Sequence, residues 1–147
     1  MLSALFVGLK SFTYKGGKMF FLTIAILGAA GVIFRYVGIQ FFNAIFSQST
    51  SLNTGLLFVN VIGSFLIGVA YVFKLKSVGN SSWVMLVVTI GFLGAFTTFS
   101  SYALEIMKAI LSKQYILAVN SFLLHNLLAI VFCFVGYWIA AKALGKA

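Results

Sequence analysis

Apolar residues run through the chain in four long stretches that are separated by short polar interruptions. The stretches cover residues 19–46, 54–73, 82–111 and 115–141, and each holds the roughly 20 residues that an α-helix needs to cross a bilayer. The interruptions fall at residues 47–51, 74–82 and 112–114. The pattern therefore predicts an all-α membrane protein with four transmembrane helices.

The third stretch contains a run that a continuous membrane helix should avoid. In residues 91–102, two glycines precede four hydroxyl side chains, Thr97, Thr98, Ser100 and Ser101. Irregular backbone at membrane depth is tolerated only where protein or a wet cavity satisfies its polar groups. The run favours a third helix broken near its middle, lining a polar pathway. The alternative is a continuous helix whose hydroxyls bond back to carbonyls.

Composition excludes most enzyme chemistry. Only 7% of the 147 residues are charged, against about 25% in a soluble domain. Glu105 is the one acid and His125 the one histidine, so neither a metal-ligand cluster nor a catalytic constellation can be assembled. We therefore expect that the chain is not an enzyme. The net charge of +9 comes from lysines at the ends of the stretches, which indicates topology signals and contacts with anionic lipid rather than nucleic acid.

The lysines also predict an orientation in the plasma (inner) membrane. Seven lie on the side shared by both termini and the central loop, and two lie on the other side: Lys10, Lys15, Lys18, Lys74, Lys76, Lys142 and Lys146 against Lys108 and Lys113. This bias places both termini in the cytoplasm. Residues 1–18, with an apolar run too short to span, form an extension ahead of the four-span domain 19–147. The extension is either an interfacial helix or disordered.

Polar residues inside the stretches are the functional candidates. Arg35 lies in the first, Asn60 in the second, and Ser121 and His125 share one face of the fourth. Arg35 can instead extend to the membrane interface, and Asn60 can instead hydrogen-bond one helix to another. His125 has no acid partner in its own stretch, which argues against a proton relay there. Hydrogen-bond donors without acids suit an anion, and aromatic rings present a positive edge to it. A cation pathway would need carboxylates or carbonyl rings.

Three motifs carry a family resemblance. They are a glycine-rich run at residues 28–36 that ends in Arg35-Tyr36, the run 55–68 around Val59-Asn60 and Gly63-Ser64-Phe65, and the run from Gly91 through Thr97-Thr98-Phe99 to Glu105. In this order and spacing the sequence resembles the Fluc/CrcB fluoride channels over about residues 20–141.

The resemblance implies a passive fluoride-selective channel that exports fluoride from the cytoplasm. It implies an antiparallel dimer of four-span subunits with two pores at the interface. A structural sodium ion would be bound by the carbonyls that match Gly94 and Thr97. The pore residues carried over are Asn60, Phe99, Ser101 and Tyr102, with Ser121 and His125 as the fourth-span polar track.

Several positions depart from the family pattern. Leu56 stands for a threonine, Tyr102 for a phenylalanine, and Ser121 and His125 for a tyrosine and a serine. Two alternatives therefore stay open. One is a proton-coupled small-anion transporter, suggested by His125 and Glu105. The other is a partner subunit of a heterodimeric fluoride channel with an incomplete pore of its own, which these departures and the uneven lysine split support. The family default is a homodimer with dual topology.

Overall fold

The computed structural model describes residues 17–46, 53–76 and 80–145, and these residues are almost entirely helical. The elements are α2 (Gly17–Phe46), α3 (Thr54–Lys76), α4 (Asn80–Val87), the π-helix η1 (Val88–Leu93), α5 (Gly94–Phe96), α6 (Phe99–Leu111) and α7 (Tyr115–Ala143). They include four stretches long and apolar enough to cross a membrane: Gly17–Phe46, Thr54–Leu75, Val84–Leu111 and Tyr115–Ala143. The predicted all-α, four-span fold is confirmed. Residues 1–16, and with them most of the expected extension, lie outside the described residues.

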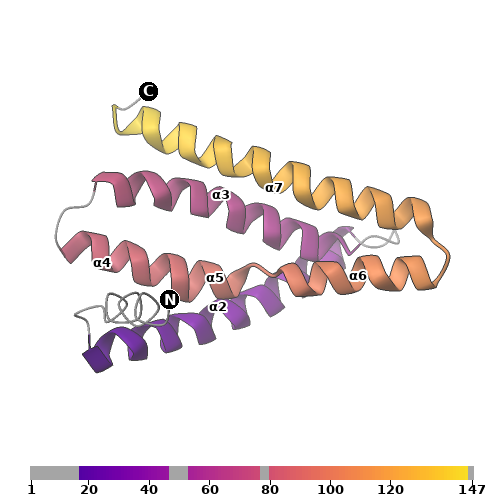
Figure 1. Ribbon diagram of the computed structural model, residues 1–147, viewed down its shortest axis with the longest axis horizontal. Coiled ribbons are helices and arrows are strands. Elements are labelled where there is room, and N and C mark those ends of the chain that lie inside the picture. Colours follow the sequence, from indigo (N-terminus) through magenta and orange to yellow (C-terminus); the bar gives the residue numbers. More distant parts are fainter. Residues whose placement is uncertain (1–16, 47–52, 77–79, 146–147) are drawn as a thin grey trace, which may run out of the picture.

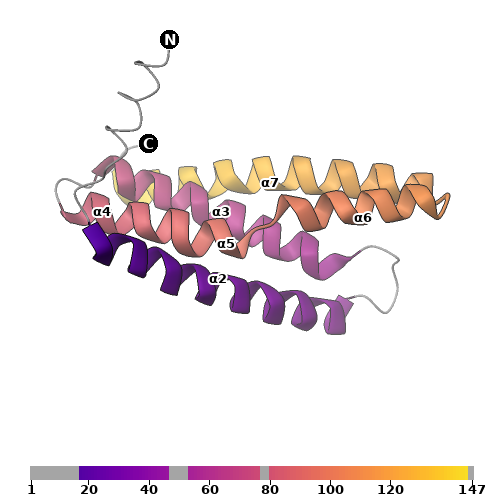
Figure 2. The same ribbon diagram turned by 60° about the horizontal axis from the view of Figure 1, so that its bottom comes forward.

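The four spans form one elongated bundle (Figures 1 and 2). α3 packs most extensively against α7, whereas α2 packs against η1, α5 and α3, and α6 packs against α7. The third span, from α4 to α6, thus touches α2 with its first half and α7 with its second half. A change of neighbour in the middle of one span is what a broken helix permits.

The contact between α3 and α7 depends on two glycines. A Cβ on Gly68 would collide with the backbone carbonyl of Cys133, and a Cβ on Gly136 would collide with the carbonyl of Phe65. Small residues allow this backbone-to-backbone approach, which drives helix association inside a bilayer. The contact fixes the position of α7 next to the middle of α3.

The third span breaks at Thr97 and Thr98, as the sequence predicted. Both residues have extended backbone, with φ −87° and ψ 157° at Thr97 and φ −150° and ψ 121° at Thr98. Figure 2 shows the interruption between α5 and α6. Gly63 lets α3 approach the break, because a Cβ there would collide with the Thr97 methyl group.

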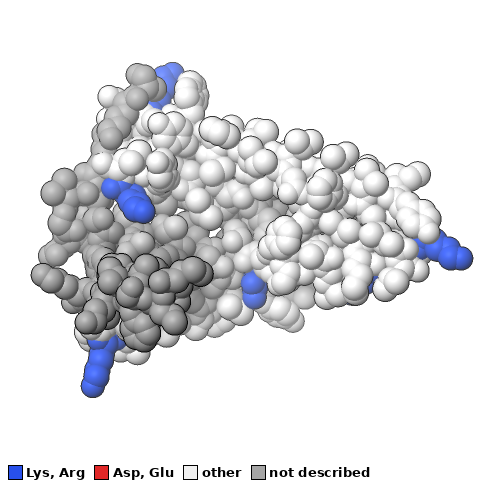
Figure 3. Space-filling view, viewed as in Figure 1, with Lys and Arg blue, Asp and Glu red and all other residues white. Residues whose placement is uncertain are grey.

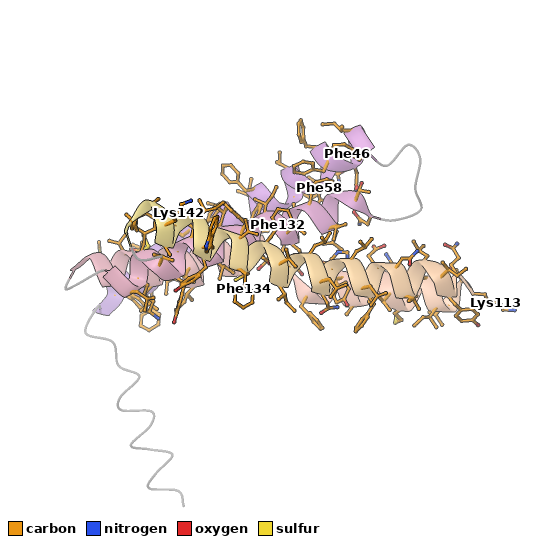
Figure 4. The ribbon with its side chains drawn as sticks, turned by 90° about the horizontal axis from the view of Figure 1, so that it is seen from above. Phe46, Phe58, Lys113, Phe132, Phe134 and Lys142 are labelled. Atoms are coloured by element: carbon orange, nitrogen blue, oxygen red, sulfur yellow. The ribbon has the colours of Figure 1, made fainter. Side chains whose placement is uncertain are left out.

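Charged side chains lie mainly at the two ends of the bundle. Figure 3 shows most of the Lys and Arg atoms there, with one further basic patch at the lower edge of the otherwise uncharged middle. Lys113 and Lys142 lie at opposite ends in Figure 4, and the Lys142 ammonium sits 5.2 Å from the centre of the Trp138 ring. Near the Lys113 end, Lys108 forms an ion pair of 3.5 Å with Glu105. The long apolar middle and charged ends match the membrane-spanning arrangement.

The end of α2 and the start of α3 are tied together. The side-chain oxygen of Asn43 accepts a hydrogen bond of 2.7 Å from the N–H of Gly55, and that of Asn53 accepts one of 3.1 Å from the N–H of Leu56. Two N–H groups at the start of α3 are thereby satisfied. Next to them the rings of Phe46 and Phe58 stack 5.1 Å apart (Figure 4).

Candidate functional site

The side chain of Asn60 hydrogen-bonds to the extended backbone at the break in the third span. Its Nδ2 donates to the carbonyl of Thr98 at 3.2 Å, and its Oδ1 accepts from the N–H of Thr98 at 2.9 Å. The amide thus gives the N–H of Thr98 the partner that a continuous helix would have supplied. It also adds a hydrogen bond to the Thr98 carbonyl, which, as the N-cap of the following helix, already accepts the first bond of that helix. Because hydrocarbon offers backbone N–H and C=O groups no other partner, this pairing stabilises the extended backbone of Thr98 at membrane depth.

Thr98 also caps the helix that follows. Its Oγ1 accepts from the N–H of Ser101 at 3.3 Å, and it lies 3.2 Å from the hydroxyl oxygens of both Ser100 and Ser101. A threonine before the first helical residue commonly satisfies such a free N–H. Three of the four hydroxyls that the sequence singled out therefore form an N-cap cluster at the start of α6, whereas the hydroxyl of Thr97 donates to the Leu93 carbonyl at 3.1 Å.

The carbonyls of Gly94 and Thr97 are among those at the break that are left without a helical partner. In a continuous helix the N–H of Thr98 would bond to Gly94 and the N–H of Ser101 would bond to Thr97. Here those two N–H groups donate instead to the side chains of Asn60 and Thr98. Gly94 is exposed, and a Cβ on it would meet only the Thr89 carbonyl, at 3.5 Å. Carbonyl oxygens are hard ligands, and they suit a hard cation such as sodium.

A cleft of about 250 Å³ lies where α3, the break and α7 meet, and we name it the polar cleft. It brings together residues far apart in the sequence. Its polar lining residues are Asn60, Ser64, Thr97, Thr98, Tyr102, His125 and Asn126, and its apolar ones are Ile67, Phe99, Ala129 and Ile130. None of these described lining residues is an acid, so the cleft offers an anion donors without a fixed negative charge.

Aromatic rings form one wall of the polar cleft. Phe99 and Tyr102 meet edge to face, with ring centres 5.3 Å apart, and Phe99 is 75% exposed whereas Tyr102 is 5% exposed. The Tyr102 hydroxyl accepts a hydrogen bond of 2.6 Å from Asn126 Nδ2. That bond leaves the hydroxyl proton of Tyr102 free to donate. An exposed aromatic ring beside a free O–H is a suitable environment for a small anion.

The fourth-span candidates differ in their positions. His125 is 5% exposed and lines the polar cleft, with its ring centre 4.7 Å from that of Tyr102. Ser121 is also buried, and its carbonyl oxygen lies 3.0 Å from His125 Nδ1. Neither Ser121 nor Ser101 is among the residues that line the cleft. A fluoride-binding role for any of these residues stays a prediction.

Arg35 lies away from the polar cleft, on α2. Its side chain is partly exposed and has no hydrogen bond or ion pair to the rest of the described chain. One turn before Arg35, at Gly31, α2 lies close to the third span, because a Cβ on Gly31 would collide with the Phe92 carbonyl.

Three polar residues of the cleft, Ser64, Thr98 and Asn126, were not among the predicted site residues. Ser64 was noted only as part of the second motif, and Thr98 only as one of four hydroxyls. The signal for Thr98 was its place before a helix start. The signal for Asn126 was an amide inside an apolar span, which in a bilayer needs a partner.

Comparisons with known proteins point to one family. Residues 22–137 match a family model described as CrcB-like protein, Camphor Resistance (CrcB). A Helicobacter pylori (strain Shi470) protein named fluoride-specific ion channel FluC is 37% identical over 125 residues, which cover 85% of this chain and 95% of that protein. A Leptospira interrogans protein of the same name is 38% identical over 118 residues, covering 80% of this chain and 91% of that protein.

Proposed function

The chain belongs to the CrcB family, and we propose that it is a passive, fluoride-selective ion channel of the plasma membrane that exports fluoride from the cytoplasm. The names of the relatives are those of an ion channel and not of an enzyme, and the four apolar helices make it a multi-pass membrane protein. Because a passive channel follows the gradient, efflux occurs whenever fluoride is higher inside the cell.

The observation that carries this proposal is the uncharged, donor-rich polar cleft at the broken span. Fluoride is small and strongly hydrated, so entering a membrane costs it several kcal/mol unless other donors replace water. Asn60, the free O–H of Tyr102 and the edge of Phe99 are such donors. A lining without acids does not repel the anion, and a lining without lysine or arginine does not trap it.

We propose that the pore is completed by a second copy placed antiparallel. Gly94, Phe99 and Ser100 are exposed, and Gly94 carries a carbonyl without a helical partner. Lipid-exposed irregular backbone does not occur within the hydrocarbon region, so another protein surface must cover this one. A copy related by two-fold symmetry would bring an identical break against it.

The same symmetry would create a sodium site. Two carbonyls from each subunit, those of Gly94 and Thr97, would give four oxygen ligands at the centre of the dimer. Sodium would neutralise the partial negative charge of the two helix ends and hold the breaks together. The fit rests on the diverted N–H groups of Thr98 and Ser101, which leave these carbonyls free.

Two observations favour alternative assemblies or mechanisms. The lysine split of seven to two opposes insertion in both orientations, which supports a heterodimer with a related, oppositely oriented subunit. A histidine in the polar cleft supports proton-coupled transport of a small anion. We favour the homodimeric channel, in contact with anionic lipid at its lysine-rich ends, as the family default.

Purified chain in liposomes tests the function. Fluoride loaded inside should leave down its gradient, as read by a fluoride-selective electrode, whereas chloride should be retained. Equal passage of both ions would refute the selectivity. Absence of flux from the chain alone, with flux restored by a co-expressed relative, would favour the heterodimer.

A further inference from the structure

His125 is buried, yet half of its hydrogen-bonding capacity is unused. Its side chain is 5% exposed, its Nδ1 lies 3.0 Å from the carbonyl oxygen of Ser121, and its Nε2 is buried without a partner in the described part of the chain. Buried polar atoms without a partner are rare and call for an explanation. This one belongs to a residue that lines the polar cleft.

The contact with Ser121 fixes the tautomer. A carbonyl oxygen only accepts hydrogen bonds, so Nδ1 must carry the proton and donate to it. In the neutral ring, Nε2 then presents only a lone pair. In the protonated ring, Nε2 carries an N–H and the ring carries a positive charge. The two protonation states therefore differ at one buried atom beside the proposed ion path.

No formal counter-charge contacts this ring within the described residues. From α6 come the uncharged ring of Tyr102 and, further away, the carboxylate of Glu105, which is itself paired with Lys108. From α3 come Asn60 and Ser64, and α7 adds Asn126, all uncharged. A buried cation is costly unless an opposite charge accompanies it. A small anion in the cleft would provide that charge.

We propose that His125 and the polar cleft form one joint site for a proton and a fluoride ion, in which each promotes binding of the other. The inference rests on the proposed fluoride function and adds its regulation. The proton is taken from water as fluoride enters and returns to water as fluoride leaves, so no net proton transport is required. Linkage makes the effect reciprocal, and couplings between sites are typically about 5- to 150-fold in affinity.

The single histidine permits a direct test on the unmodified chain. Nitrogen NMR of histidine-labelled protein in lipid nanodiscs gives one imidazole, whose tautomer and charge can be read between about pH 5 and 8. We expect the neutral ring to carry its proton on Nδ1. At a given pH the imidazolium share should be larger in sodium fluoride than in sodium chloride. Equal shares in the two salts, or a neutral ring protonated on Nε2, would overturn the inference.

Fluoride flux supplies the second test. At subsaturating fluoride, wild-type flux should rise about tenfold as the pH falls through the range in which histidine titrates. The variant His125→Gln replaces the imidazole by a neutral amide of similar length that takes up no proton, so its flux should not follow pH. Asn120→Gln, an exposed position outside the cleft, should behave as wild type.

Two controls separate the possible failures. Protein-free liposomes measure the leak of undissociated hydrogen fluoride, which is subtracted at each pH. Wild-type protein that conducts fluoride at no pH would overturn the proposed function itself. Wild type and His125→Gln with the same pH profile would overturn only the joint site. If His125→Gln does not fold, the NMR comparison of the two salts on wild-type protein decides.

Discussion

Replacing Asn60 by aspartate tests the polar cleft by a change of only one functional group. The carboxylate can still accept the hydrogen bond of 2.9 Å from the Thr98 N–H, but it can no longer donate to the Thr98 carbonyl. The break therefore keeps one of its two supports. At the same time a fixed negative charge enters the proposed fluoride path.

The charge sets the expected magnitude. Two like charges about 4 Å apart repel by about 4 kcal/mol at an effective dielectric constant of about 20. Because about 1.4 kcal/mol corresponds to a factor of ten, fluoride flux should fall by about a thousandfold. Separately, loss of the donor to Thr98 should lower the free energy of unfolding by about 0.5–1.5 kcal/mol, since one hydrogen bond is lost while the carbonyl keeps its bond within α6.

Fluoride efflux from liposomes measures the effect, with circular dichroism and size-exclusion chromatography to confirm folding. The matched control is Asn120→Asp, which introduces the same carboxylate at an exposed position of α7 outside the cleft. We expect normal flux in the control. Folded Asn60→Asp protein with flux within tenfold of wild type would refute the placement of Asn60 in the fluoride path.

Three further predictions concern packing, sodium and orientation. Gly68→Ala should lower the free energy of unfolding by about 1–3 kcal/mol, because the new Cβ collides with the Cys133 carbonyl. Gly94→Ala should leave the subunit fold intact but weaken the dimer in a native-gel or cross-linking assay. Equal losses of stability in the two variants would contradict this difference. Exchange of all sodium for a large organic cation should reduce flux and dimer stability, and unchanged values would count against the carbonyl site. A cysteine tag added at the C-terminus should label from both sides of the membrane if a dual-topology homodimer forms, and labelling from one side only would favour the heterodimer.

The spans and the break were predictable from local sequence. Hydrocarbon thickness fixes the length of a spanning helix, and the polar interruptions mark the ends. The break follows from Gly94 and the hydroxyls after it, because such a cluster is out of place in a continuous membrane helix.

The contacts that shape the site were not predictable, because they join distant segments. Nothing in the sequence around Asn60 indicates that it bonds to Thr98, 38 residues away. The pairing of Asn126 with Tyr102, and the unpartnered Nε2 of His125, likewise depend on how α6 packs against α7. The π-helical turn η1 before the break carries no distinctive residues of its own.

The reversal potential of the current across a planar bilayer tests the central claim most directly. With unequal fluoride and equal chloride on the two sides, a passive fluoride-selective channel reverses at the equilibrium potential of fluoride. The value should stay there when a pH difference is imposed, even if the size of the current changes. A reversal potential that follows chloride, or one that shifts with the proton gradient, would contradict the account.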